Sequence, residues 1–231
     1  MHTENIDWAA VTADLDDLGV ALTGPILDPD QCAALRDLYG QDSRFRSTID
    51  MARHRFGEGQ YRYFDRPLPR LVDELRHAFW PQLLAVARVW TTRRGEQAAW
   101  PDELDDWLDQ CHEAGQVRPT PLMLRYGTGD WNALHRDLYG DLVFPLQVVI
   151  GLDDPTVDYS GGEFVVVEQR LRAQSRATTV TIPCGHGVVF TTRDRPIRSQ
   201  RGWANAPMRH GVSVVRSGQR HTLGLIFHDA R

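Results

Sequence analysis

The chain has 231 residues, of which 42% are hydrophobic and 25% charged, as expected for one well-packed soluble unit with a helical extension. Its formal net charge of −5 argues mildly against a generic binder of polyanions, and no apolar run approaches the ~20 residues that cross a bilayer. The first ten residues lack the apolar stretch of a signal peptide, and three widely spaced cysteines without a CxxC pair predict reduced thiols in a cytoplasm.

The first third of the chain is predicted to be mainly helical. Asp28 precedes Pro29, and Gln31 follows three residues after Asp28, which is the pattern of an N-cap, a proline in the first turn and a capping-box partner. A helix therefore begins here and ends near Gly40. Further amphipathic helices are expected at 6–18, 67–92 and 101–114, with a short strand at 20–22 and a break or kink at Pro81.

From residue 119 the chain changes to short β-branched runs separated by Gly and Pro, which predict strands. The expected strands are 121–126, 142–152, 163–168, 177–182, 187–192, 212–216 and 220–227. Seven or eight short strands of this kind indicate a sandwich or jelly roll. We therefore expect an α+β fold in one compact unit, with a mainly helical region at 1–117 packed on a β core at 118–231.

A metal site is predicted at His135, Asp137 and His210. The first two lie two residues apart, so on an extended segment both side chains point the same way, and His210 begins a strand-like run farther along. Two imidazoles and one carboxylate occupy one face of an iron ion and leave the opposite positions open. His-x-Asp also occurs by chance, as a surface histidine beside a solvated aspartate.

The residues after His210 strengthen the metal interpretation. Arg220 and Thr222 lie at even spacing from His210, so they line the same interior if the turn at 217–219 preserves the alternation. A guanidinium supplies a planar fork for a second carboxylate. Together these residues predict chemistry with Fe(II), 2-oxoglutarate and O2.

Eleven short blocks carry a resemblance to a known superfamily. They read RYF from Arg62, CHEAGQ from Cys111, RPTPL from Arg118, LRYG from Leu124, NALHRDLYG from Asn132, FPLQ from Phe144, GGEF from Gly161, EQR from Glu168, QSR from Gln174, RHGVS from Arg209 and GLIFHDA from Gly224. The chain resembles the Fe(II)/2-oxoglutarate-dependent dioxygenases, and within them a bacterial family of oxygenases acting on alkylation-damaged DNA. The resemblance covers about residue 60 to the C-terminus.

The resemblance implies a double-stranded β-helix, that is a jelly roll, with His135, Asp137 and His210 as iron ligands. It further implies that Arg220 binds the distal carboxylate of 2-oxoglutarate, that Thr222 adds a hydroxyl to it, and that Tyr126 contacts the cosubstrate; as a tyrosine alone, Tyr126 fits a core position equally well. One departure is Arg136, where the family pattern has Gln. This position is expected to point away from the metal.

The substrate is less well defined by the sequence. Residues 116–231 hold 14 Arg against 10 acids, whereas residues 1–115 hold 12 Arg against 21 acids, so the half with the metal motif is basic. Two segments combine arginines with aromatics: Arg193, Arg195, Arg198, Arg201, Trp203 and Arg209 in one, and Arg53, Arg55, Phe56, Tyr61, Arg62, Tyr63, Phe64 and Arg66 in the other. Such mixtures suit phosphate contacts and stacking on an unpaired base.

Three functions therefore stay open at this point. One is oxidative demethylation of alkylated nucleobases, with alkylated or single-stranded DNA as partner. The second is hydroxylation of a small molecule or amino acid, since Arg-rich rims also hold carboxylates and the segment 193–201 also fits a solvated loop paired with Asp194. The third, a non-catalytic jelly-roll binding module, is opposed by the metal motif and Arg220. No membrane or protein partner is predicted.

Supporting polar residues are also expected near the metal. Glu163 and Gln147 are candidates to orient ligands or cosubstrate, and His186 is the best placed of the remaining histidines. Hydrogen-bonded structural roles are expected for the others: His112, His221 and His228.

Overall fold

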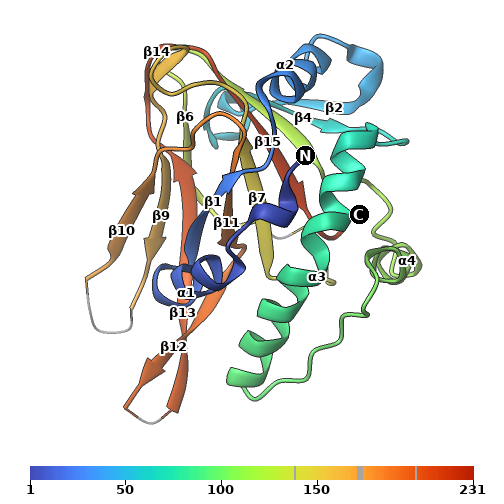
Figure 1. Cartoon of the computed structure of the whole chain (residues 1–231), viewed down its shortest axis with the longest axis vertical. Helices are drawn as coiled ribbons and strands as arrows, with labels where there is room; N and C mark the ends of the chain where they lie inside the picture. The colour runs from blue at the N-terminus through green and yellow to red at the C-terminus, as the bar shows by residue number, and fades with distance from the viewer. Residues whose placement is uncertain (138, 171–173, 201) are drawn as a thin grey trace.

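The computed structural model describes residues 1–137, 139–170, 174–200 and 202–231. Two antiparallel sheets form the centre of the molecule, and the main helices lie against one of them (Figure 1). The seven-stranded sheet has the order β1 (Val20–Pro25), β11 (His186–Thr191), β7 (Leu146–Gly151), β15 (Arg220–Ile226), β5 (Leu122–Tyr126), β4 (Gln60–Phe64) and β2 (Phe45–Asp50).

The second sheet has six strands, five of them in its main path. Their order is β10 (Arg176–Val180), β9 (Phe164–Glu168), β13 (Gly202–Val212), β6 (Trp131–His135) and β3 (Gly57–Glu58), with β12 (Asp194–Ser199) paired to β13 off that path. A short pair joins β8 (Tyr159–Gly161) to β14 (Val215–Gly218). Two facing antiparallel sheets with long crossovers are the predicted jelly roll, so the expected α+β fold class is confirmed.

Four α-helices accompany the sheets: α1 (Trp8–Leu18), α2 (Pro29–Leu38), α3 (Arg70–Arg93) and α4 (Leu104–Glu113). Single 3-10 turns occur at Thr3–Asn5, Asp42–Arg44 and Ala52–His54. The start of α2 is as predicted, because the Asp28 side chain accepts from the Gln31 backbone at 2.8 Å while the Gln31 side chain accepts from the Asp28 backbone at 3.2 Å. Among the residues described, no helix is both long and apolar enough to span a bilayer.

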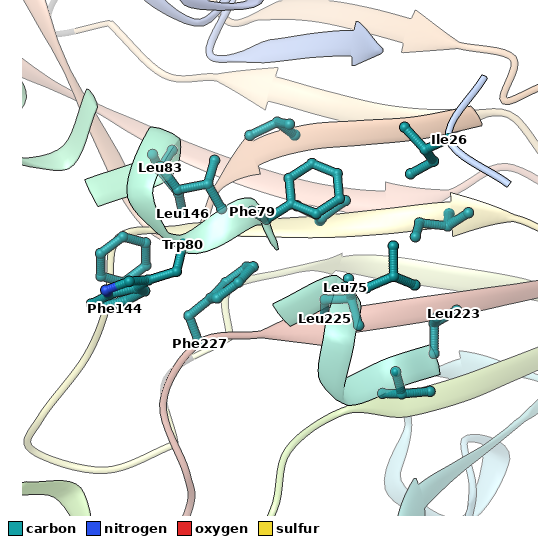
Figure 2. Packing of buried hydrophobic residues seen from close by; sticks show 14 of the residues in the cluster. Ile26, Leu75, Phe79, Trp80, Leu83, Phe144, Leu146, Leu223, Leu225 and Phe227 are labelled. Atoms are coloured by element: carbon teal, nitrogen blue, oxygen red, sulfur yellow. The ribbon is translucent and has the colours of Figure 1, made fainter. Parts of the chain in front are cut away.

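Of the expected break or kink at Pro81, the break is wrong, since α3 runs continuously through it for 24 residues. An internal proline costs a helix about 3 kcal/mol, so packing must compensate. Phe79, Trp80 and Leu83 flank Pro81 and pack against Phe144 and Phe227 of the sheet side (Figure 2). This apolar contact holds both halves of the helix in line.

The helices cover one face of the seven-stranded sheet and leave the other for the site. Leu146, Ile150, Leu223 and Leu225 point to the helices and belong to the largest buried apolar cluster (Figure 2). Their neighbours in the same strands, such as Gln147 and Thr222, line a cavity on the opposite face. Because side chains alternate along β7 and β15, residues on one face build the core under the helices and their neighbours line the cavity.

Several expected strands form, and others were not foreseen. The predicted run 212–216 is wrong, because Val212 ends β13 and Val215 begins β14, with the Ser213 backbone donating to the Glu163 carbonyl instead. Helix throughout the first third is also wrong, since β2, β3 and β4 lie between residues 45 and 64. The seven-stranded sheet includes three strands from the region before residue 117, namely β1, β2 and β4. The division of the chain at residue 117 stays a prediction.

Candidate metal centre

Strands β6 and β13 bring the predicted metal ligands together. His135 and His210 are paired residues of these strands, and a bulge follows between His210 and Val212. Asp137 lies just past the end of β6. Its carboxylate oxygens are 3.4 Å from His135 Nε2 and 3.1 Å from His210 Nε2. One ligand atom from each of the three residues lies within 4.8 Å of the others, a spacing suited to a single ion.

The charge states of the three groups also suit a cation. Burial by itself raises the pKa of Asp137. The two neighbouring imidazoles lower it by a larger amount, so the pKa lies well below its usual range and the carboxylate is ionised. Burial lowers the pKa of His210, which keeps this imidazole neutral. For His135, burial lowers the pKa and the hydrogen bond to Asp137 raises it, with a net rise. An ionised carboxylate beside a neutral imidazole is what a divalent metal requires.

A cavity of about 230 Å³ opens beside these ligands between the two sheets. Most of its wall is apolar, from residues such as Leu124, Val149, Phe164, Phe190 and Ile226. Its polar groups besides the ligands include Arg220, Thr222, Tyr126 and Asn132. The structure thus places Arg220, Thr222 and Tyr126 in one chamber with the three ligands.

Arg220 is the unusual group in this chamber. Its side chain is 1% exposed, and its Nε and Nη2 have no hydrogen-bond partner among the described residues. Its guanidinium carbon lies 5.5 Å from the centre of the Tyr126 ring. Gly162, at φ +64°, passes so close that an added Cβ would lie 2.9 Å from the Arg220 side chain. A buried guanidinium with free N–H groups is costly, and an anionic ligand would remove that cost.

Asp137 is held by two further side chains, of which the sequence indicated one. Gln147 Nε2 donates to Asp137 Oδ2 at 2.9 Å, and Tyr139 Oη donates to Oδ1 at 2.9 Å. Gln147 was a candidate to orient a ligand; Tyr139 was missed. Its position two residues after Asp137 was an available signal, because alternation directs both side chains to one side.

Other expected supporting residues lie elsewhere. Glu163 accepts from the Ser213 hydroxyl, and His186 Nδ1 lies 3.1 Å from the Cys184 carbonyl at the start of β11. Neither lines the cavity. His112 contacts Asp229, His221 contacts Asp153, and His228 accepts from the Phe144 backbone. These three histidines have hydrogen-bonded partners, as expected for structural groups.

The segment 193–201 is not a loop over the site. Most of it forms strand β12 in a hairpin with β13 (Figure 1). Arg195 is buried and its Nε donates to Glu168 at 2.8 Å, while Arg193 pairs with Asp194. Arg198 lies over Trp203 at 4.1 Å; Arg201 lies outside the described residues. Arg195 is therefore used within the fold, whereas Arg193 and Arg198 are exposed.

In the basic and aromatic segment at 53–66, some side chains pair within the fold and others line the cavity. Arg62 is buried over Phe45 at 4.5 Å and Arg66 pairs with Asp229. Phe56 and Tyr61 line the cavity, and Phe56 is 47% exposed, so it lies at the opening. Arg136 also lines the cavity, contrary to the expectation that it points away, and its Nε donates to the Met208 carbonyl at 3.0 Å.

The His-Asp-His cluster and the buried arginine lie in one chamber of the jelly roll. Three solved structures share the fold. A prolyl-4-hydroxylase of Pseudomonas putida superposes with a TM-score of 0.57 at 18% identity, covering 97% of this chain and 99% of that one. A 2OG-Fe(II) oxygenase family oxidoreductase of Burkholderia pseudomallei gives 0.54 at 17%, over 96% and 91%. A prolyl hydroxylase of Trichoplax adhaerens gives 0.56 at 13%, over 95% and 87%.

Sequence comparison gives the family. An uncharacterized protein of Mycobacterium tuberculosis is 63% identical over 167 residues, 72% of each chain. Residues 59–230 match the sequence model of Oxygenase-NA, described as an oxygenase catalysing oxidative methylation of damaged DNA. The chain belongs to this family, and it is an oxidoreductase.

Proposed function

We propose that His135, Asp137 and His210 bind Fe(II) and that Arg220 binds 2-oxoglutarate in an oxygenase that hydroxylates a C–H bond. The observation that carries this proposal is Arg220, a buried guanidinium with two unpartnered nitrogens in the same cavity as the ligand cluster. A dicarboxylate that reaches from the metal to Arg220 satisfies both features, because a guanidinium binds a carboxylate through two parallel hydrogen bonds.

The side chains of this protein supply binding, orientation and exclusion of water. Thr222 follows Arg220 on the same face of β15 and adds a hydroxyl toward the same carboxylate. Tyr126 is fully buried, and Asn132 donates to its hydroxyl at 3.3 Å; this leaves the Tyr126 proton for the cosubstrate. Bound iron and 2-oxoglutarate would supply the oxidising power, by decarboxylation of the keto acid with O2. The apolar wall keeps the reacting C–H bond away from bulk water.

The first candidate substrate is an alkylated nucleobase in DNA. The family description names damaged DNA, and an oxygenase removes an N-methyl group by hydroxylating it, after which formaldehyde is lost. Phe56 at the cavity opening offers an aromatic face for a base, and Trp131, 40% exposed, lies on the neighbouring strand β6, opposite Glu58. A base must leave its stack to enter such a pocket.

The second candidate is a small molecule or amino acid. It is favoured by the small, mostly apolar cavity of about 230 Å³ beside the ligand cluster. It is also favoured by the burial of Arg62 and Arg195, whose pairing within the fold removes them from a phosphate-binding surface. The net charge of −5 also argues against a phosphate-binding surface.

Two measurements test the proposal. Succinate formation from 2-oxoglutarate with added Fe(II) is expected for the wild type, and a wild-type level in Asp137→Ala would refute the ligand assignment. A formaldehyde-release screen over methylated bases, single-stranded DNA and amino acids then separates the substrates. Repair of DNA predicts binding that weakens steeply with salt; a metabolite hydroxylase predicts coupled turnover without DNA binding.

A further inference from the structure

Both oxygens of the Asp137 carboxylate are held by donors from outside the ligand cluster. Tyr139 donates to Oδ1 and Gln147 donates to Oδ2, each at 2.9 Å. The same two oxygens face the metal cluster, since Oδ1 is nearest His135 and Oδ2 nearest His210. Tyr139 comes from the chain just past β6, and Gln147 from β7 in the other sheet. Asp137 is therefore tied to both sheets.

Tyr139 is the last of a row of three tyrosines. Its ring lies 6.3 Å from the Tyr63 ring at 87°, and the Tyr63 ring lies 5.4 Å from the Tyr61 ring at 87°. The rings of Tyr61, Tyr63 and Tyr139 thus follow one another edge to face, and the Tyr139 hydroxyl at the end of the row bonds to Asp137. Tyr61 and Tyr63 share one face of β4, because they are two residues apart.

The direction of the bond between Tyr139 and Asp137 follows from proton counting. A phenol has one proton to donate, and Tyr139 Oη lies 2.9 Å from Asp137 Oδ1. An ionised carboxylate can only accept, so Tyr139 must donate to Asp137. Tyr63 and Tyr61 pack behind Tyr139 and hold its ring in place.

A free aspartate carboxylate rotates readily, because its last torsion is broad and two-fold. Donors on both oxygens remove that freedom and leave a lone pair of each oxygen for an ion. We propose that the row Tyr61, Tyr63 and Tyr139, together with Gln147, positions the Asp137 carboxylate for metal binding. Tyr139 acts directly, whereas Tyr63 and Tyr61 act through it. The proposal rests on the proposed function only in taking Asp137 as a metal ligand.

Tyr61 gives the row a second consequence, because it also lines the cavity. A substrate seated against Tyr61 contacts the far end of a row of packed rings that ends on the metal ligand. Arg46 lies over the Tyr63 ring at 4.5 Å and fixes the middle of the row. The row thus connects the substrate chamber with the carboxylate.

The test is Co(II) binding to the metal-free protein, followed by absorbance under anaerobic conditions. Tyr139→Phe removes one hydroxyl and is expected to weaken Co(II) binding about 10- to 100-fold, the usual effect of losing an outer hydrogen bond. Tyr63→Phe is expected to weaken it less, and Tyr61→Phe least. Tyr39→Phe is the matched control, since Tyr39 is a buried tyrosine whose hydroxyl donates to Gln60 on the α2 side.

Thermal unfolding without metal distinguishes positioning from a loss of fold. The proposal requires Tyr139→Phe and Tyr39→Phe to unfold near the wild-type temperature while only Tyr139→Phe loses Co(II) affinity. Wild-type affinity in Tyr139→Phe, or equal losses in both variants, would overturn it. Failure of the wild type itself to bind one Co(II) would instead contradict the proposed function, so the two failures are distinguishable.

Discussion

His135 and His210 are paired residues on the antiparallel strands β6 and β13, and their ring centroids lie 4.3 Å apart. One strand pairing therefore builds the imidazole half of the cluster, and Asp137 completes it two residues past His135. Phe164 and Phe190 pack on His210 at 5.8 and 4.7 Å. These rings hold the imidazole against the cluster before any ion arrives.

Replacing either histidine by glutamine is expected to remove one metal ligand while keeping a side chain of similar length. Metal affinity should fall by more than the roughly 10- to 100-fold that loss of an outer hydrogen bond causes. Metal binding of His135→Gln and His210→Gln, measured by titration, checks this. His186→Gln is the control, because His186 lies outside the cavity; equal losses in all three variants would contradict the assignment.

Arg220→Met is expected to weaken 2-oxoglutarate binding by about 100-fold, since hydrogen bonds to a charged group contribute roughly 1.5–3 kcal/mol. The reason is loss of the two unpartnered nitrogens of a side chain that lines the cavity. The apparent KM for 2-oxoglutarate measures the effect, and metal affinity should stay near wild type. Arg216→Met on exposed β14 serves as the control. An unchanged KM in Arg220→Met would remove Arg220 from the cosubstrate site.

Arg195 tests the structural interpretation of the Arg-rich segment. Its guanidinium is buried against Glu168, which is 1% exposed. Glu168 also pairs with Arg170 and Arg176. Glu168→Gln leaves the buried Arg195 charge and these two arginines without their carboxylate, so the free energy of unfolding should fall by about 3–5 kcal/mol. Urea unfolding measures it. Arg193→Gln, on a half-exposed pair, should change stability by under about 1 kcal/mol. A small effect of Glu168→Gln would mean that Arg195 is free for another partner.

His228 predicts an acid-sensitive term in stability. Burial, with nearby Arg76, lowers its pKa from 6.5 to about 4. Since the folded pKa is below the unfolded one, folding favours the neutral imidazole. The contribution is present above pH 6.5 and is lost as pH falls toward 4, by up to about 3 kcal/mol.

Unfolding by urea at pH 7 and pH 4.5 measures this term. His228→Asn keeps an acceptor for the Phe144 N–H group but no group that titrates in this range, so its stability should fall less between the two pH values. His2→Asn, at an exposed histidine, should follow the wild type. A wild-type acid response in His228→Asn would show that His228 is not the source.

The features that the sequence predicted are those encoded locally. The capping box of α2 uses residues within four positions, and the His-x-Asp spacing needs only an extended segment. The roles assigned to His135, Asp137, His210, Arg220, Thr222 and Tyr126 stay predictions until the variants are measured, although the structure brings all six to one cavity.

What the sequence did not predict depends on distant partners. Strand β4 pairs with β5, about sixty residues away, and its alternating aromatics and arginine read as a surface segment. Arg195 reads as a substrate contact until Glu168 on β9 is seen to face it. Tyr139 and Gln147 both donate to Asp137 because this residue lies between β6 and β7. Such contacts follow from strand order, which local patterns do not specify.

The central claim is that three side chains hold one iron ion, and anaerobic titration of the metal-free protein with Fe(II) in the presence of 2-oxoglutarate tests it most directly. The account predicts one bound Fe(II) per chain for the wild type and for Asp141→Ala, an exposed aspartate that pairs with Arg231. It predicts no tight binding for Asp137→Ala. Wild-type binding in Asp137→Ala would contradict it.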